Sequence, residues 1–144
     1  IAGNTDATPT TQSFRYTAGN LSPTVTSDES SSFAEGGTGI VYLATGTDPD
    51  AGTVLSWSLS GADAARFTID ATTGEVRFRT APNFEAPADA GADNTYDITV
   101  IASDGMLTAS RAVAVTVTPV DEAPVITAPA FAAIGYAADG TAAV

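Results

Sequence analysis

The sequence predicts an all-β fold, and three patterns support this prediction. Short apolar runs recur along the chain, with turn-forming residues between them about every 8–12 residues. In one run, Leu55, Trp57 and Leu59 stand at every second position, as expected of a strand with one buried face. Two further runs are joined by Ala71-Thr72-Thr73-Gly74, which is typical of a β-hairpin that needs a glycine with positive φ. Together these patterns indicate an antiparallel β-sandwich.

The predicted elements follow in order along the chain. The first strand is expected in two pieces that end at the break Gly36-Gly37, and the last two strands are joined by the tight turn Ser103-Asp104-Gly105. One helical turn is expected over 61–66, where Asp63 could cap it. The expected strands are 24–27 with 32–35, 40–46, 54–59, 67–70, 75–79, 96–102 and 106–118. Seven short strands of this kind are typical of an Ig-like sandwich with Greek-key topology.

The alternation of apolar residues also predicts which side chains fill the core. Trp57 is assigned to the core and not to a sugar-binding surface, because it lies on an apolar face at strand spacing. The predicted core consists of Val41, Leu43, Leu55, Trp57, Leu59, Phe67, Ile69, Val76, Phe78, Tyr96, Ile98, Val100, Leu107, Val113, Val115 and Val117.

A boundary motif occurs twice, which predicts a tandem array. The stretch 118–124 is echoed by 17–23, and the prolines Pro23 and Pro124 are 101 residues apart (124 − 23). The stretch 34–41 is echoed by 137–144. Periods of this length indicate arrayed globular domains. We therefore expect residues 1–22 to be the last strand and linker of one repeat, 23–123 to be a complete repeat, and 124–144 to be the linker and first strand of the next.

Composition and charge exclude several classes of function. The net charge is −12, from 17 acidic residues against five basic ones, all of them arginine. This balance argues against nucleic acid and anionic membranes as partners and in favour of cations. The chain has no cysteine and no histidine, so the common acid–base and thiol groups of enzymes are missing and catalysis is not expected. No apolar run approaches the ~18–20 residues of a membrane span, so membrane insertion is not expected either.

Polar residues are predicted to gather at the two ends of the sandwich. Consecutive antiparallel strands alternate in direction, so their connections alternate between a lower and an upper end. The lower end is expected to hold Glu35, Asn83, Glu85, Asp121 and Glu122, and the upper end Asp48, Asp50, Asp104 and Asn20. Clustered oxygen ligands without nitrogen or sulfur favour Ca²⁺. The alternative for any one of these residues is an ordinary solvated loop position.

Five separated motifs give the chain a family resemblance. They are Ala34-Glu35-Gly36-Gly37-Thr38, Asp48-Pro49-Asp50, Asn83-Phe84-Glu85, Ala102-Ser103-Asp104-Gly105 and Val120-Asp121-Glu122-Ala123-Pro124. In this order and spacing, the stretch 23–124 resembles a cadherin repeat of the kind found in bacterial surface adhesins. The resemblance implies that Ca²⁺ ions bind between consecutive repeats and stiffen the linker.

The sequence departs from the family pattern at four places, one of which is the upstream linker Ala18-Gly19-Asn20, which is poor in acid. Asn83 stands where the pattern has Asp, Pro119 stands where an acidic residue is common, and Ala138 replaces the glutamate of the following repeat. The loop 85–94 is also longer than a tight turn requires. Its residues Asp89, Asp93 and Asn94 are either ligands of an additional ion or part of an ordinary acidic loop.

Two hypotheses about function follow. The first is a calcium-rigidified repeat that acts as a spacer or adhesive stalk at the cell surface, with neighbouring repeats as its partners. The alternative is a filament subunit, in which identical chains pair through the flanking strands by strand addition. A sugar-binding module would need an exposed aromatic row, which the sequence lacks, and Arg77 and Arg79 are interpreted as a solvated face. Because each site between repeats needs ligands from both sides of a linker, we expect incomplete sites in this chain alone.

Overall fold

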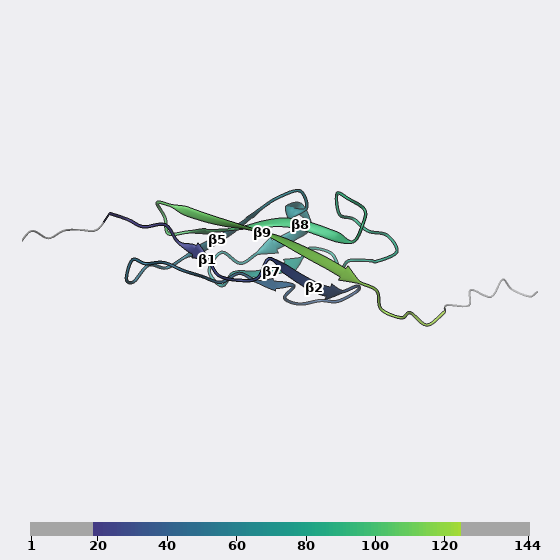
Figure 1. The fold of residues 1–144 in the computed structure, drawn as a ribbon. Helices are drawn as coiled ribbons and strands as arrows, with labels where there is room; N and C mark the ends of the chain where they lie inside the picture. The colour runs from purple at the N-terminus through teal and green to yellow at the C-terminus, as the bar shows by residue number, and fades with distance from the viewer. Residues whose placement is uncertain (1–18, 125–144) are drawn as a thin grey trace, which may run out of the picture.

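The computed structural model describes residues 19–124, whose strands form two packed layers (Figure 1). One layer is a four-stranded sheet in the order β2-β9-β8-β5. The other holds a three-stranded sheet, β3-β7-β6, and a two-stranded sheet, β1-β4. The elements are β1 (Thr24–Val25), β2 (Ser30–Ala34), β3 (Tyr42–Leu43), β4 (Gly46–Thr47), β5 (Ser56–Ser60), η1 (Ala64–Arg66), β6 (Phe67–Ile69), β7 (Glu75–Phe78), β8 (Thr95–Ser103) and β9 (Thr108–Thr118). The predicted all-β sandwich is confirmed.

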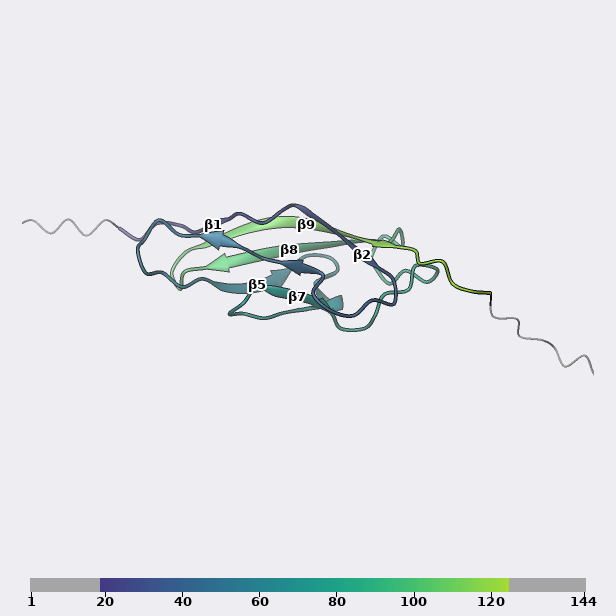
Figure 2. The same ribbon diagram turned by 90° about the horizontal axis from the view of Figure 1, so that it is seen from below.

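The first predicted strand is split between the two layers. Its first piece, β1, pairs antiparallel with β4, and its second piece, β2, pairs with β9 over five residues. The β2–β9 pair is parallel, which differs from the wholly antiparallel expectation. The reason is that the chain passes from β1 to the four-stranded sheet without reversing direction. As a result β2 points the same way as the last strand, β9 (Figure 2).

The predicted strand 40–46 is interrupted, and this changes the core. Val41 and Tyr42 are both buried, and the Tyr42 hydroxyl donates to Ser27 Oγ at 2.7 Å, which satisfies it in that position. Two consecutive buried residues break the alternation, so Leu43 is 49% exposed and not in the core as predicted. Leu107 was also wrongly assigned to the core. It is 38% exposed because it belongs to the β8–β9 turn, beyond the packed part of the two strands.

The core lies between the two layers and contains an aromatic cluster. The Phe67 ring lies 4.3 Å from the Phe78 ring and meets Tyr96 edge-on at 5.8 Å. Trp57 is buried, as predicted. Predicted core residues that are only partly buried, Leu55, Leu59, Ile69 and Phe78, pack against the buried ones. The prediction missed Val25, Tyr42, Ala44 and Ala102. Burial of each large apolar side chain contributes roughly 1.5–3 kcal/mol.

The chain enters and leaves the described part at opposite ends. Residue 19 lies at one end of the elongated body and residue 124 at the other, and the long connection between β7 and β8 lies near residue 124 (Figure 1). We call the end with residue 19 the upper end and the end with residue 124 the lower end. The predicted flanking strands, at 13–17 and after 124, lie outside the described residues.

Candidate metal sites at the two ends

At the upper end, the incoming chain is held against two acidic loops. The Asn20 Nδ2 donates to Asp104 Oδ2 at 2.9 Å, and the Leu21 amide donates to Asp50 Oδ2 at 2.7 Å. The Asp50 amide in turn donates to Asp48 Oδ1 at 2.7 Å. These contacts join the four residues that the sequence assigned to this end into one connected group.

One oxygen in this group has no partner. Asp48 Oδ2 is buried and accepts no hydrogen bond within the described residues. A buried carboxylate oxygen without a donor is costly, because it has lost its water and gained nothing in exchange. The contacting Asp50 and the other two residues of this group, Asn20 and Asp104, offer further oxygens and no cationic side chain. This donor set suits a hard cation such as Ca²⁺.

Asp104 is oriented by its own turn. Its Oδ1 accepts the amides of Met106 and Leu107, both at 2.7 Å, and Gly105 has a φ of 97° that closes the turn. These amides, Leu107 first and Met106 second, hold the pKa of Asp104 below its ordinary value, and the Asn20 side chain lowers it slightly further. Asp104 is therefore ionised at neutral pH, with Oδ2 directed at the incoming chain.

At the lower end, Glu35 joins the outgoing chain to the β7–β8 connection. It is 7% exposed; its Oε1 accepts the Val120 amide at 2.7 Å and its Oε2 the Phe84 amide at 2.8 Å. These two amides, Val120 before Phe84, hold the pKa of Glu35 below its ordinary value. The Glu85 side chain approaches the same carboxylate and adds a smaller lowering.

The other predicted lower residues are less well gathered. Asn83 Oδ1 accepts the amides of Glu85 at 2.9 Å and Ala86 at 3.1 Å, whereas Asp121 and Glu122 are exposed. Within residues 19–124, no three acidic side chains converge into a set that could hold a metal on their own. At the lower end, Glu35 thus ties the start of the linker to the β7–β8 connection, and the side chains of Asp121 and Glu122 next to it are exposed.

The long loop before β8 is organised by buried acids. Asp89 accepts the amides of Asp93 and Asn94, at 3.0 and 3.1 Å, with its two oxygens. Burial acts to raise the pKa of Asp89, but these amide bonds outweigh it and the pKa is lowered. The loop acid that the sequence offered as a ligand of an additional ion therefore has a structural use in the described chain.

Asp63 has a similar role that the sequence did not indicate. It is 4% exposed and makes no side-chain cap to η1, contrary to the prediction. Instead its two oxygens accept the amides of Ala90 at 2.7 Å and Asp97 at 2.8 Å, which ties the loop to β8. No local signal marks this role, because both donors are far away in the sequence.

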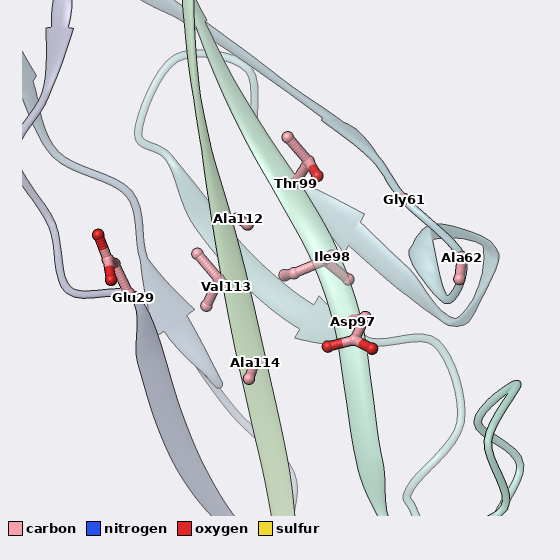
Figure 3. A pocket seen from close by; sticks show the side chains of 9 residues that line it. All are labelled: Glu29, Gly61, Ala62, Asp97, Ile98, Thr99, Ala112, Val113 and Ala114. Atoms are coloured by element: carbon pink, nitrogen blue, oxygen red, sulfur yellow. The ribbon is translucent and has the colours of Figure 1, made fainter.

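A hollow on the outer face of the four-stranded sheet does not resemble a site. It has a volume of about 430 Å³ and is floored by short side chains of β8 and β9, such as Ala112, Ala114 and Thr99 (Figure 3). Its two acids, Glu29 and Asp97, lie on opposite sides of β9 (Figure 3). Polar groups therefore do not converge there.

Comparison with solved structures supports the architecture. Human protocadherin-24 EC1-2 matches 69% of this chain and 44% of its own, with 24% identity and a TM-score of 0.58. Drosophila N-cadherin EC1-3 matches 71% of this chain and 35% of its own, with 20% identity and a TM-score of 0.59. Mouse cadherin-23 EC22-24 matches 68% of this chain and 31% of its own, with 25% identity and a TM-score of 0.52. The chain thus has the fold of a cadherin extracellular domain and spans less than half the length of these structures.

Comparisons of sequence add no closer relationship. No family model matches the sequence, and no curated protein matches it either. In the part of the chain that the structure describes, the helix η1 has three residues, and no helix is long and apolar enough to cross a membrane.

Proposed function

We propose that this chain is a calcium-binding repeat of an extracellular tandem array, serving as a rigid spacer or adhesive stalk of a bacterial surface protein. The observation that carries the proposal is the buried, unpartnered Asp48 Oδ2, in a carboxylate whose other oxygen accepts the Asp50 amide, at the end of the fold where Asn20 bonds Asp104. A divalent cation is the partner that this oxygen lacks. The cadherin-type fold and the exit of the chain at opposite ends support an arrangement of repeats in series.

The two ends would hold the ion in half-sites. Asp48, Asp50, Asp104 and Asn20 are the upper half, and Glu35, Asn83, Glu85, Asp121 and Glu122 are the lower half of the following boundary. A bound Ca²⁺ supplies positive charge that cancels carboxylate repulsion and fixes the linker. The neighbouring repeat contributes the remaining ligands, which explains why three acids do not converge within residues 19–124.

Thermal unfolding tests the proposal. The melting temperature should rise by several degrees in millimolar Ca²⁺ relative to excess chelator, because a ligand that binds only the folded state stabilises it, by about 2.7 kcal/mol at 100 times its Kd. Mg²⁺ should have little effect, since it demands a tighter octahedral shell. Asp48→Asn and Glu85→Ala should each reduce the calcium shift.

Asp97→Asn is the matched control, because Asp97 is an exposed acid on β8 that belongs to neither half-site. The proposal fails if Ca²⁺ leaves the melting temperature unchanged, or if Asp97→Asn reduces the shift as much as Asp48→Asn does.

A further inference from the structure

Two arginines face each other across the β6–β7 hairpin. The Arg79 amide donates to the Arg66 carbonyl at 2.9 Å, which continues the register of the pair Phe67 and Phe78 by one step. Residues directly opposite in an antiparallel pair have Cβ atoms about 4.5–5.5 Å apart, and like charges at this position are destabilising. The hairpin therefore keeps two positive charges together at a cost, in a chain whose net charge is −12.

No carboxylate in residues 19–124 neutralises this pair. Neither Arg66 nor Arg79 makes an ion pair there, although both are exposed. Their neighbour Arg77 differs, because its Nη2 lies 3.0 Å from Glu75 Oε2. The sequence suggested a solvated face for Arg77 and Arg79. In the structure Arg77 is paired with a carboxylate, whereas Arg66 and Arg79 are not, and we call these two arginines the unpaired couple.

The unpaired couple lines a hollow next to the lower end. The hollow has a volume of about 390 Å³ and lies between η1, the end of β7 and the loop after it. Phe78, Pro82, Asn83 and Tyr96 line it together with Arg66 and Arg79, and its lining contains no acidic residue. Its size falls within the range of about 300–1,000 Å³ for sites that bind small molecules.

Asn83 adds a donor to this lining. Its Oδ1 is occupied by the amides of Glu85 and Ala86, which leaves its Nδ2 hydrogens for another acceptor. An aspartate here, as the family pattern has, would place a negative charge at the hollow. The departure at Asn83 therefore keeps the lining free of negative charge.

We propose that this hollow binds a sugar that bears a carboxylate, a residue of the uronic-acid class, which is held through its charge and not through the exposed aromatic row that this chain lacks. Guanidinium groups bind planar carboxylates through paired, charge-assisted hydrogen bonds. The apolar walls of Phe78, Pro82 and the adjacent alanines suit the C–H faces of a sugar ring. A bare inorganic anion has no apolar groups that could contact them. A peptide is less suited, because the adjacent edge strand β6 has only three residues to pair with.

Binding of D-glucuronate tests this site, measured by NMR titration and calorimetry in the presence of chelator. The chelator removes calcium, so the outcome is independent of the proposed calcium sites. Glucuronate should shift the amides of residues 66, 79 and 83, and glucose should not. Arg66→Gln and Arg79→Gln should each weaken binding about tenfold or more, because a hydrogen bond to a charged group is lost. Arg77→Gln, the matched control, should leave binding unchanged.

Other outcomes overturn the proposal. Glucose binding as tightly as glucuronate would remove the role of the carboxylate, and sulfate or a glutamyl peptide binding more tightly at the same residues would assign the hollow to another ligand. Equal binding by Arg66→Gln, Arg79→Gln and Arg77→Gln would remove the arginine pair from the site. The melting temperature checks independently that the variants fold. Removing one of two like charges that face each other should leave it unchanged or slightly raised.

Discussion

At the scale of single residues, the acids whose carboxylate oxygens are buried fall into two kinds. Glu35, Asp63 and Asp89 each have both carboxylate oxygens bonded to backbone amides, so burial costs them little. Asp48 has one oxygen bonded and one without a donor. The sequence shows all four as acids in or beside loops and cannot separate the kinds, because the difference depends on which distant amides point at each side chain.

Asp63→Ala tests the structural kind. The change should lower the free energy of unfolding by about 2–4 kcal/mol, because it leaves the amides of Ala90 and Asp97 without an acceptor. Urea denaturation measures the loss. Asp63→Asn, which keeps one acceptor oxygen, should lose less than Asp63→Ala. Equal stability of Asp63→Ala and the unaltered chain would show that the two amides find other acceptors.

At the scale of elements, structure that depends on local signals was predicted well, whereas structure that depends on contacts between distant residues was not. The β6–β7 hairpin was located from its turn alone, since Gly74 has a φ of 76° and Asp70 Oδ1 accepts the amides of Thr72 and Thr73. The alternation over 40–46 gave the wrong faces because Tyr42 is held inward by Ser27, which lies between β1 and β2. The alternation of apolar residues is a property of a single strand, so it gives no information about a hydrogen-bond partner elsewhere in the chain.

Two glycine substitutions separate backbone strain from crowding. At both Gly74 and Gly105 φ is positive, but a Cβ at Gly74 would lie 2.5 Å from the Ala44 carbonyl oxygen, whereas a Cβ at Gly105 would meet nothing within 4 Å. Gly105→Ala should cost about 1–2 kcal/mol, the usual cost of a left-handed conformation. Gly74→Ala should cost more, about 2–4 kcal/mol, because the hairpin must also move away from Ala44, which lies between β3 and β4. Comparable losses in thermal unfolding would contradict this difference.

At the scale of the whole molecule, the alternation of strand direction (strand parity) predicted which loops share an end better than it predicted how the strands pair in the sheets. Alternating strand directions indicated which loops share an end, and Asn20, Asp50 and Asp104 do meet at the upper one. Parity says nothing about a strand that changes sheet without turning, so the parallel β2–β9 pair was missed.

The pH dependence of stability is a property of the whole molecule. Glu35, Asp70, Asp89 and Asp104 all have pKa values lowered on folding, so their contribution is fully present above the ordinary carboxylate pKa of about 4 and is lost as the pH falls through the lowered values. Repulsion among the many acids acts in the opposite direction, but 0.15 M salt screens exposed charges more than about 8 Å apart. In chelator and this salt, the melting temperature should therefore fall between pH 5 and pH 2.

The carboxylates responsible can be identified by variants. Glu35→Gln and Asp104→Asn should flatten the decline, because the neutral side chains no longer titrate, whereas Arg77→Gln should leave its slope unchanged. A melting temperature that rises on acidification would mean that charge repulsion outweighs the amide bonds.

The parallel pairing of β2 with β9 has a consequence for a chain under tension. Residues 19 and 124 lie at opposite ends of the body, so a pull on the two ends draws β2 toward one end and β9 toward the other (Figure 1). The five paired residues are then loaded in shear, and their hydrogen bonds must break together instead of opening one after another as in a zipper. Resistance to stretching is thus built into the strand order, in addition to any stiffness that bound ions give to the linkers.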